Sequence, residues 1–270
     1  MQIASRQLVW NKGGRGTVVE VEMTPATGLY IKFITGNERK EPFSVSWGDG
    51  SGTQEFPSDN HYEALEHTFP AYGKYRIVFV NITNIGFRWL DGQAHYPYDA
   101  AILSIVDYAG TLTGAHSGAF SRCVNLERYI APNNRGCGQR PFAYCTKLKE
   151  AQLGQCGIHY DGSFQGCTAL EKFTTVSTGC CWSYVWEGCT KLRELRLGAV
   201  EQFATRDFNN TPNLMDIWIG DKTVDQIRQV APSGNIVAGY GARFPWNANP
   251  LCRFHGTDGV VLGNGTIING

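Results

Sequence analysis

The sequence has no long apolar run. Its 270 residues contain no segment near the roughly 20 consecutive apolar residues that a membrane-spanning helix requires, so we expect no membrane insertion. The start of the chain also lacks the apolar core of about 7–15 residues that marks a secretory signal. Either such a signal has been removed, or the protein does not use that export route.

The sequence also lacks a charge excess and a recognisable catalytic motif. It carries 24 Lys and Arg against 24 Asp and Glu, so nothing favours a nucleic-acid or anionic-membrane partner. No nucleophile with a base, paired carboxylates, phosphate-binding glycine loop or HExxH motif occurs in the context that its chemistry requires. We therefore expect a protein without enzymatic activity and without a cofactor.

What the sequence does contain is a 22-residue repeat, which runs without insertion or deletion from Ser117 to Gly220. Its copies share a large aromatic residue, at Phe120, Phe142, Phe164, Trp186 and Phe208. Three positions later stand Cys123, Cys145, Cys167, Cys189 and, as the exception, Thr211. After three more positions come Leu126, Leu148, Leu170, Leu192 and Leu214. Five such copies indicate a solenoid, in which each unit stacks on the next.

The pattern within one copy predicts a short helical turn followed by a short strand. Good helix N-caps dominate the position three residues before the aromatic, which holds Ser117, Gln139, Asp161, Ser183 and Thr205. A helical turn would place the aromatic and the cysteine, at i and i+3, on one inward face. The alternating L-x-x-Φ-x-Φ segment predicts a strand, and strands of successive copies should lie about 4.8 Å apart.

The aromatic-x-x-Cys-x-x-Leu-x-x-Φ-x-Φ unit resembles the BspA-type leucine-rich repeat of bacterial surface proteins. The resemblance covers roughly residues 100–220 and implies a leucine-rich-repeat solenoid over residues 86–270. Within it we expect an irregular N-terminal cap at 86–116, five repeats at 117–220 and a C-terminal cap at 221–270. In the N-terminal cap, Tyr96-Pro-Tyr98 is interpreted as a packed loop, with a carbohydrate platform as the alternative.

Two local signals lie in the C-terminal cap. Thr223 and Gln226 have the spacing of a capping box that opens a short helix ending near Val230. Asn264-Gly265, between two β-branched runs, predicts a hairpin with a type I′ turn.

Residues 1–85 predict a separate β domain, so the whole chain should be mainly β. Strands are expected at Gln7–Trp10, Thr17–Met23, Leu29–Thr35, Phe43–Trp47, Tyr62–Phe69 and Tyr75–Val80. The turn Trp47-Gly-Asp-Gly-Ser51, followed by His67-Thr-Phe69 and Gly73-Lys-Tyr75, is similar to the polycystic-kidney-disease (PKD) domain. That resemblance implies an immunoglobulin-like β-sandwich. Asp49 is interpreted as a turn-forming residue, with a calcium ligand as the alternative, and His67 should hydrogen-bond inside the sandwich.

Nine cysteines look like a disulfide framework, but the repeat argues against it. Cysteines in one column would run parallel, one strand spacing apart, which fits disulfide geometry poorly. We expect these four to be free and packed as small apolar groups. A second column, Cys137, His159 and Cys181, invites a zinc site, but its outer members would lie about 10 Å apart, so we expect no metal. Cys156, Cys180 and Cys252 stay unassigned, and a bridge from Cys180 or Cys181 stays open.

The solvent-facing strand positions form three columns. They read Glu127, Lys149, Glu171, Arg193, Met215; Arg128, Glu150, Lys172, Glu194, Asp216; and Ile130, Gln152, Thr174, Arg196, Trp218. Charges alternate in sign along most of the first two columns. In a structural interpretation, this alternation fixes the register of the strands and keeps the sheet soluble.

The functional interpretation is a contact site at the far end of these columns, because Trp and Arg dominate interface energetics. There Asp216 follows Glu194 with the same sign, and Met215 and Trp218 should expose apolar area beside Arg196. In the competing interpretation the segment Phe244–Trp246 covers Trp218, which would make it part of the cap.

The sequence as a whole predicts a non-enzymatic binding or adhesion protein, at the bacterial cell surface or secreted. Both resembled families imply a host or extracellular protein, a mucin or a glycan as the partner. The alternative is a structural or receptor-binding component of a phage or prophage particle, which the missing signal peptide favours.

Overall fold

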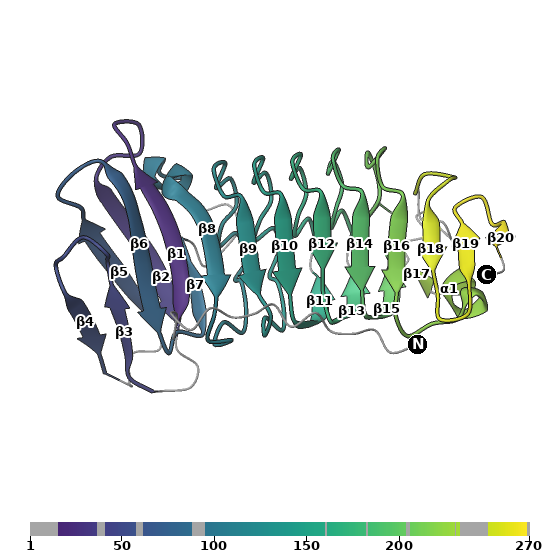
Figure 1. The fold of residues 1–270 in the computed structure, drawn as a ribbon, viewed down its shortest axis with the longest axis horizontal. Helices are drawn as coiled ribbons and strands as arrows, with labels where there is room; N and C mark the ends of the chain where they lie inside the picture. The colour runs from purple at the N-terminus through teal and green to yellow at the C-terminus, as the bar shows by residue number, and fades with distance from the viewer. Residues whose placement is uncertain are drawn as a thin grey trace.

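The chain forms one elongated row of strands, with the N-terminal unit at one end and a short hairpin at the other (Figure 1). The computed structural model describes residues 16–36, 41–57, 62–87, 95–159, 161–181, 183–203, 206–229, 231–232 and 248–268. The described chain is mainly β, with a 3₁₀ helix η1 (Pro97–Ala101) and an α-helix α1 (Val224–Gln229). Neither has the length and hydropathy that crossing a membrane requires.

Most of the strands belong to one continuous sheet of 13 strands, in the order β20-β19-β18-β16-β14-β12-β10-β9-β8-β1-β6-β3-β4. The N-terminal unit supplies β1 (Thr17–Met23), β3 (Phe43–Ser46), β4 (Thr53–Phe56) and β6 (Gly73–Val80). The joining strand is β8 (Ile102–Asp107). The solenoid supplies β9 (Arg128–Ala131), β10 (Glu150–Leu153), β12 (Lys172–Thr174), β14 (Glu194–Leu197), β16 (Asp216–Ile219) and β18 (Arg253–His255). The final hairpin is β19 (Val260–Leu262) and β20 (Ile267–Ile268).

The N-terminal unit consists of two packed sheets. Its second sheet contains β5 (Tyr62–Thr68), β2 (Tyr30–Gly36) and β7 (Asn84–Gly86). Phe33 of β2 meets Phe79 of β6 edge to face, with ring centroids 5.5 Å apart, and stacks on Trp47 at 6.3 Å. The strands expected between residues 17 and 80 are confirmed, β4 was not predicted, and Gln7–Trp10 lies outside the described residues. The resemblance of this unit to the PKD domain stays a prediction.

The N-terminal unit and the solenoid share the large sheet. β1 pairs antiparallel with β8, and β8 pairs parallel with β9. The segment expected to be an irregular cap therefore includes a regular strand. Asp107, fully buried, ties this junction together: Thr17 Oγ1 donates to its Oδ1 at 3.1 Å, and the Leu112 N–H donates to its Oδ2 at 2.8 Å.

Most solenoid rungs contribute a second strand that the sequence pattern did not predict. These strands are β11 (Gln155–His159), β13 (Ser177–Cys181), β15 (Ala199–Phe203) and β17 (Ala231–Pro232), and they form a parallel sheet of their own. Strand partners within the repeats are 22 residues apart, as for Glu150 with Lys172 and Ser177 with Ala199. The repeat region is therefore a β-solenoid whose register follows the sequence repeat.

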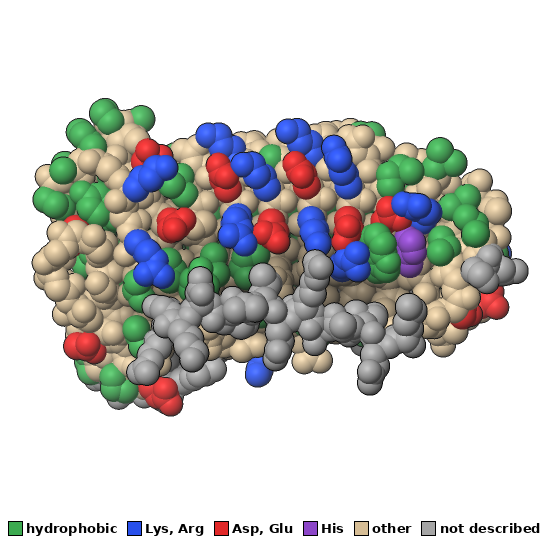
Figure 2. Space-filling view, in the orientation of Figure 1, with side chains coloured by type: hydrophobic (Ala, Val, Ile, Leu, Met, Phe, Trp, Pro, Cys, Tyr) green, Lys and Arg blue, Asp and Glu red, His purple; other side chains and the backbone are tan. Residues whose placement is uncertain are grey.

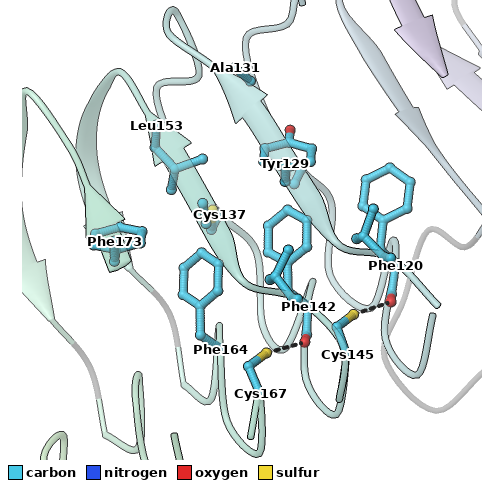
Figure 3. Packing of buried hydrophobic residues seen from close by; sticks show 14 of the residues in the cluster. Phe120, Tyr129, Ala131, Cys137, Phe142, Cys145, Leu153, Phe164, Cys167 and Phe173 are labelled. Atoms are coloured by element: carbon cyan, nitrogen blue, oxygen red, sulfur yellow. Dashed lines mark hydrogen bonds between the residues drawn. The ribbon is translucent and has the colours of Figure 1, made fainter. Parts of the chain in front are cut away.

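The aromatic column forms the core of the solenoid (Figure 3). Phe142 and Phe164 stack with ring centroids 5.1 Å apart, and Phe120 stacks on Phe142 at 5.6 Å. Trp186 and Phe208 stack at 5.8 Å further along. Each of these rings is at most 1% exposed, so the column excludes water from end to end.

The cysteines of the repeat are buried and free, as the sequence predicts. Their thiols also have a role that the sequence did not reveal. Three of them donate to the carbonyl oxygen of the aromatic residue one rung earlier: Cys145 to Phe120 and Cys167 to Phe142, both at 3.1 Å (Figure 3), and Cys189 to Phe164 at 3.2 Å. Burial raises the pKa of the Cys167 and Cys189 thiols, which keeps them neutral donors.

The segment around each aromatic is a ladder of turns, and the predicted helical turn is wrong. Backbone bonds alternate between rungs: the Cys123 N–H binds the Phe120 carbonyl in its own rung, and the Arg122 N–H binds the Ala143 carbonyl in the next at 2.8 Å. The residue two positions after the aromatic has a φ between 55° and 75°, at Arg122, Tyr144, Gly166, Gly188 and Asn210. A right-handed helix cannot continue through a left-handed residue.

The C-terminal cap confirms one local prediction and corrects another. Thr223 Oγ1 accepts the Gln226 N–H at 3.3 Å, and Gln226 Oε1 accepts the Thr223 N–H at 2.9 Å, so the capping box is present at the start of α1. The β19–β20 hairpin also forms, but a type I′ turn needs positive φ at both Asn264 and Gly265. Of the two, Gly265 alone has it (87°). The Gly265 N–H closes a turn on the Leu262 carbonyl at 2.8 Å, which makes this a three-residue loop ending in a left-handed glycine.

Candidate functional site

The exposed face of the solenoid sheet carries positive and negative side chains in alternation (Figure 2). The alternation arises because every second residue of a strand faces solvent and the repeat places opposite charges on neighbouring strands. Lys149 Nζ lies 2.8 Å from Glu127 Oε2, and Lys172 Nζ lies 3.7 Å from Glu194 Oε1. Exposed pairs of this kind contribute at most about 1 kcal/mol each, so the ladder acts mainly on register.

The same ladder continues into the N-terminal unit. Arg128 of β9 pairs in register with Ser104 of β8, whose hydroxyl donates to Glu20 Oε2 of β1 at 2.9 Å. Glu20 stands opposite Arg76 of β6. The joining strand therefore bridges two charged surfaces, and the compensated face extends over both parts of the chain.

The far end of this face is built differently. Arg196, Trp218 and His255 occupy successive strands β14, β16 and β18, and we name them the Arg–Trp–His cluster. The guanidinium carbon of Arg196 lies 4.3 Å from the Trp218 ring centroid. The His255 ring stacks on Trp218 with centroids 4.3 Å apart and an interplanar angle of 5°. Since β16 lies between β14 and β18, the indole is held between a cation and an imidazole.

β18 also supplies partners for Asp216. His255 Nε2 lies 2.7 Å from Asp216 Oδ1, and Arg253 Nη2 lies 2.5 Å from Asp216 Oδ2. Burial acts to raise the pKa of Asp216, but the hydrogen bonds from Arg253 and His255 hold it below its ordinary value. Glu194 pairs with Arg196. The like charges of Glu194 and Asp216 are thus each compensated by a neighbour.

The structure brings the five predicted site residues together on or beside two adjacent strands. They are Glu194, Arg196, Met215, Asp216 and Trp218. Met215 is 36% exposed and Trp218 is half-buried. The segment expected to cover Trp218, Phe244–Trp246, lies outside the described residues.

Sequence reasoning missed His255 and Arg253. The 22-residue register ends at Gly220, so no periodic signal places β18 beside β16. The alternating Arg253-Phe-His255 is too short to identify a strand by itself.

In the second candidate region, the Asp49 carboxylate is hydrogen-bonded by Ser51 and His67. Asp49 Oδ1 accepts the Ser51 N–H at 3.0 Å and its hydroxyl at 2.6 Å, and Oδ2 lies 2.6 Å from His67 Nε2. Burial acts to raise the pKa of Asp49, but the bonds from Ser51 and His67 lower it to about 2. The Trp47 ring stacks on His67 at 4.4 Å. The predicted hydrogen bond of His67 is confirmed, and both Asp49 oxygens are engaged, Oδ1 by Ser51 of the turn and Oδ2 by His67 of β5.

No group of His, Cys, Asp and Glu side chains in the part of the chain that the structure describes could hold a metal ion. Cys137 and Cys181 are buried, while the side chains of Cys156, His159 and Cys180 lie outside the described residues. Cys252 is buried and free, and burial raises its pKa to about 12.

The stacked rungs and their repeat define a leucine-rich-repeat solenoid. More particularly, the chain belongs to the BspA type leucine-rich repeat family, whose model matches residues 98–179 and 115–235 in six copies. No curated protein matches the sequence. Among solved structures, the crystal structure of a T. pallidum leucine-rich repeat protein is similar, with 20% sequence identity and a TM-score of 0.37. The match covers 44% of this chain and 64% of that one.

Proposed function

We propose that this chain is a non-enzymatic binding protein that acts in adhesion at the bacterial cell surface, or after secretion. In this proposal its solenoid sheet engages a host or extracellular protein or glycan. Leucine-rich-repeat solenoids are a fold often used for protein binding, because stacked repeats present an extended surface. The observation that carries the proposal is the Arg–Trp–His cluster.

The cluster supports the proposal because it differs from the rest of its face. Along the ladder a partner would have to displace one exposed ion pair to form another, which yields little net free energy. At the cluster, the open edge of the half-buried indole and the exposed Met215 offer apolar area beside a guanidinium, although Arg196 is itself paired with Glu194. Trp and Arg are the residues that most often dominate interface energetics. The stack holds Trp218 in place before binding, so less side-chain entropy is lost when a partner docks.

The test is an array of extracellular-matrix proteins, mucins and glycans, probed with the purified chain and with Trp218→Ala. We expect the variant to lose about 2 kcal/mol of binding free energy toward the partner found, or roughly 30-fold in affinity. Thr174→Ala is the matched control, because Thr174 occupies the same column two rungs away. It should leave affinity unchanged.

The melting temperature separates binding from packing. Trp218 lies on the outer face of the sheet, away from the buried core, so its truncation should lower the melting temperature only modestly, through loss of its contacts with Arg196 and His255. Unchanged affinity in Trp218→Ala would contradict the proposed site. A large drop in melting temperature together with normal binding by the folded fraction would make the cluster a packing feature of the cap.

A further inference from the structure

A cavity of about 740 Å³ lies where the N-terminal unit meets η1. It is far from the Arg–Trp–His cluster in the fold, since its walls come from β2, the end of β7 and the start of η1. Aromatic side chains dominate the lining: Tyr30, Phe87, Tyr96 and Tyr98. The volume lies within the range of about 300–1,000 Å³ typical of small-molecule sites.

Tyr96 provides a flat, exposed ring on a rigid backing. Its ring stacks on Tyr98 with centroids 5.1 Å apart and an interplanar angle of 8°. Tyr98 is only 7% exposed and packs edge to face against Tyr30 at 5.7 Å and Phe87 at 5.3 Å. Tyr96 itself is 48% exposed. One face of its ring is therefore covered by protein, and the other is available to a ligand.

The backbone holds this ring in place. The Tyr96 N–H donates to Asp99 Oδ2 at 3.0 Å, and the Asp99 side chain is nearly fully buried. Pro97 follows directly and restricts the chain at the first position of η1. The exposed aromatic is thus presented by a capped turn, which reduces the entropy cost of using it in binding.

A polar pair stands at the rim of the cavity. Lys32 lines it, and Lys32 Nζ lies 2.9 Å from Glu66 Oε1. The pair is neutral overall and places a hydrogen-bond donor beside an acceptor. The Tyr30 hydroxyl also hydrogen-bonds Glu66, and burial together with this carboxylate raises the pKa of Tyr30.

We propose that this cavity binds a neutral pyranose unit of a glycan. The apolar C–H face of the sugar stacks on the exposed Tyr96 ring. Two neighbouring hydroxyls, each able to donate and accept, bind Lys32 and Glu66. This inference rests on the proposed function, because glycans are one of the partner classes proposed there. It assigns a site separate from the Arg–Trp–His cluster.

Other ligands of aromatic pockets fit the lining less well. A quaternary ammonium group prefers a cage of aromatic faces, and here Lys32 brings a positive charge into the lining. A proline ring packs on aromatic faces as a sugar does, but it has no hydroxyl groups for the Lys32–Glu66 pair. A charged ligand would leave one member of that pair opposed by like charge.

The test uses the full chain and a panel of methyl pyranosides of glucose, galactose, mannose and N-acetylglucosamine, followed by saturation-transfer NMR and titration calorimetry. We expect saturation to be transferred from the protein to the ring protons of at least one of these sugars. Tyr96→Ala should weaken that binding by about tenfold or more. Lys32→Met should weaken it several-fold. Tyr72→Ala is the control, because Tyr72 is 54% exposed and lies outside the cavity lining.

Three results would overturn the inference. They are absence of binding to every pyranoside, binding that Tyr96→Ala leaves unchanged, and Tyr96-dependent binding of tetramethylammonium or a polyproline peptide in place of a sugar. Trp218→Ala distinguishes this site from the proposed one, since it should leave pyranoside binding unchanged. Circular dichroism of each variant confirms that lost binding does not reflect lost folding.

Discussion

Phe164→Ala tests whether the aromatic column supports the solenoid. Phe164 is fully buried, stacks on Phe142 at 5.1 Å and meets Phe173 edge to face at 5.0 Å. Truncating a buried phenylalanine costs about 3–5 kcal/mol. A domain is stable by only about 5–15 kcal/mol, so the variant should lose a large part of its free energy of unfolding and express poorly in soluble form.

The assay is urea denaturation followed by far-ultraviolet circular dichroism, which gives the free energy of unfolding. Phe164→Leu is the conservative comparison, because it keeps much of the buried volume and should lose less. Phe120→Ala provides a second comparison in the first rung. From its position in the first rung alone, Phe120→Ala should lose less free energy of unfolding than Phe164→Ala in the middle rung. The structure predicts a similar loss, because Phe120 is fully buried and Phe87 of the N-terminal unit lies 6.4 Å away on its outer side.

Two results would refute this reasoning. A loss below about 1 kcal/mol in Phe164→Ala would mean that the site is not a packed core, since buried truncations cost more. A clearly smaller loss in Phe120→Ala would mean that the N-terminal unit does not close the first rung.

Two further predictions concern the thiols and the turn around Asp49. Thiol alkylation with mass spectrometry should find the core cysteines unreactive in the folded chain and all free after denaturation, namely Cys123, Cys145, Cys167 and Cys189; a Cys123–Cys145 bridge would contradict the stacking geometry. Because the pKa of Asp49 is lowered from 3.8 to about 2 on folding, its contribution to stability is present above pH 4 or so and is lost as the pH falls toward 2. Acid titrations of wild type and Asp49→Asn should therefore diverge above that window and converge below it, whereas parallel curves would show that His67 and Ser51 do not stabilise the carboxylate.

The repeat made much of the solenoid predictable. Because the interval is constant, aligning the copies shows which positions share a column, and the aromatic, cysteine and leucine columns are all buried. The helical turn was mispredicted because helix N-caps and i, i+3 spacing also suit a chain of turns. Hydrogen bonds between rungs, such as that from the Arg122 N–H to the Ala143 carbonyl, favour the series of turns over a helical turn. The sequence of a single copy does not reveal these bonds.

The candidate site shows the same division. The column that contains both Arg196 and Trp218 follows directly from the register, so the sequence placed these residues side by side. The stacking of His255 on Trp218 did not follow, because β18 lies beyond the last repeat. The cavity at η1 was predictable only in part: Tyr96-Pro-Tyr98 carried a carbohydrate platform as its alternative interpretation, but Tyr30 comes from a segment with no shared period.

The sequence by itself thus determined the register of the repeats, and with it most of the side chains that face the core or solvent. Ile130 is the exception: it was expected in a solvent-facing column, but it is only 6% exposed. Such information is local, because one side-chain pattern recurs at a constant interval. The tertiary structure alone decided how the solenoid is closed at its ends: β8 joins it to the N-terminal unit, and β18 extends it past Trp218. Those pairings join segments of unlike sequence, and a strand's choice of partner depends on contacts across the fold that its own residues do not encode.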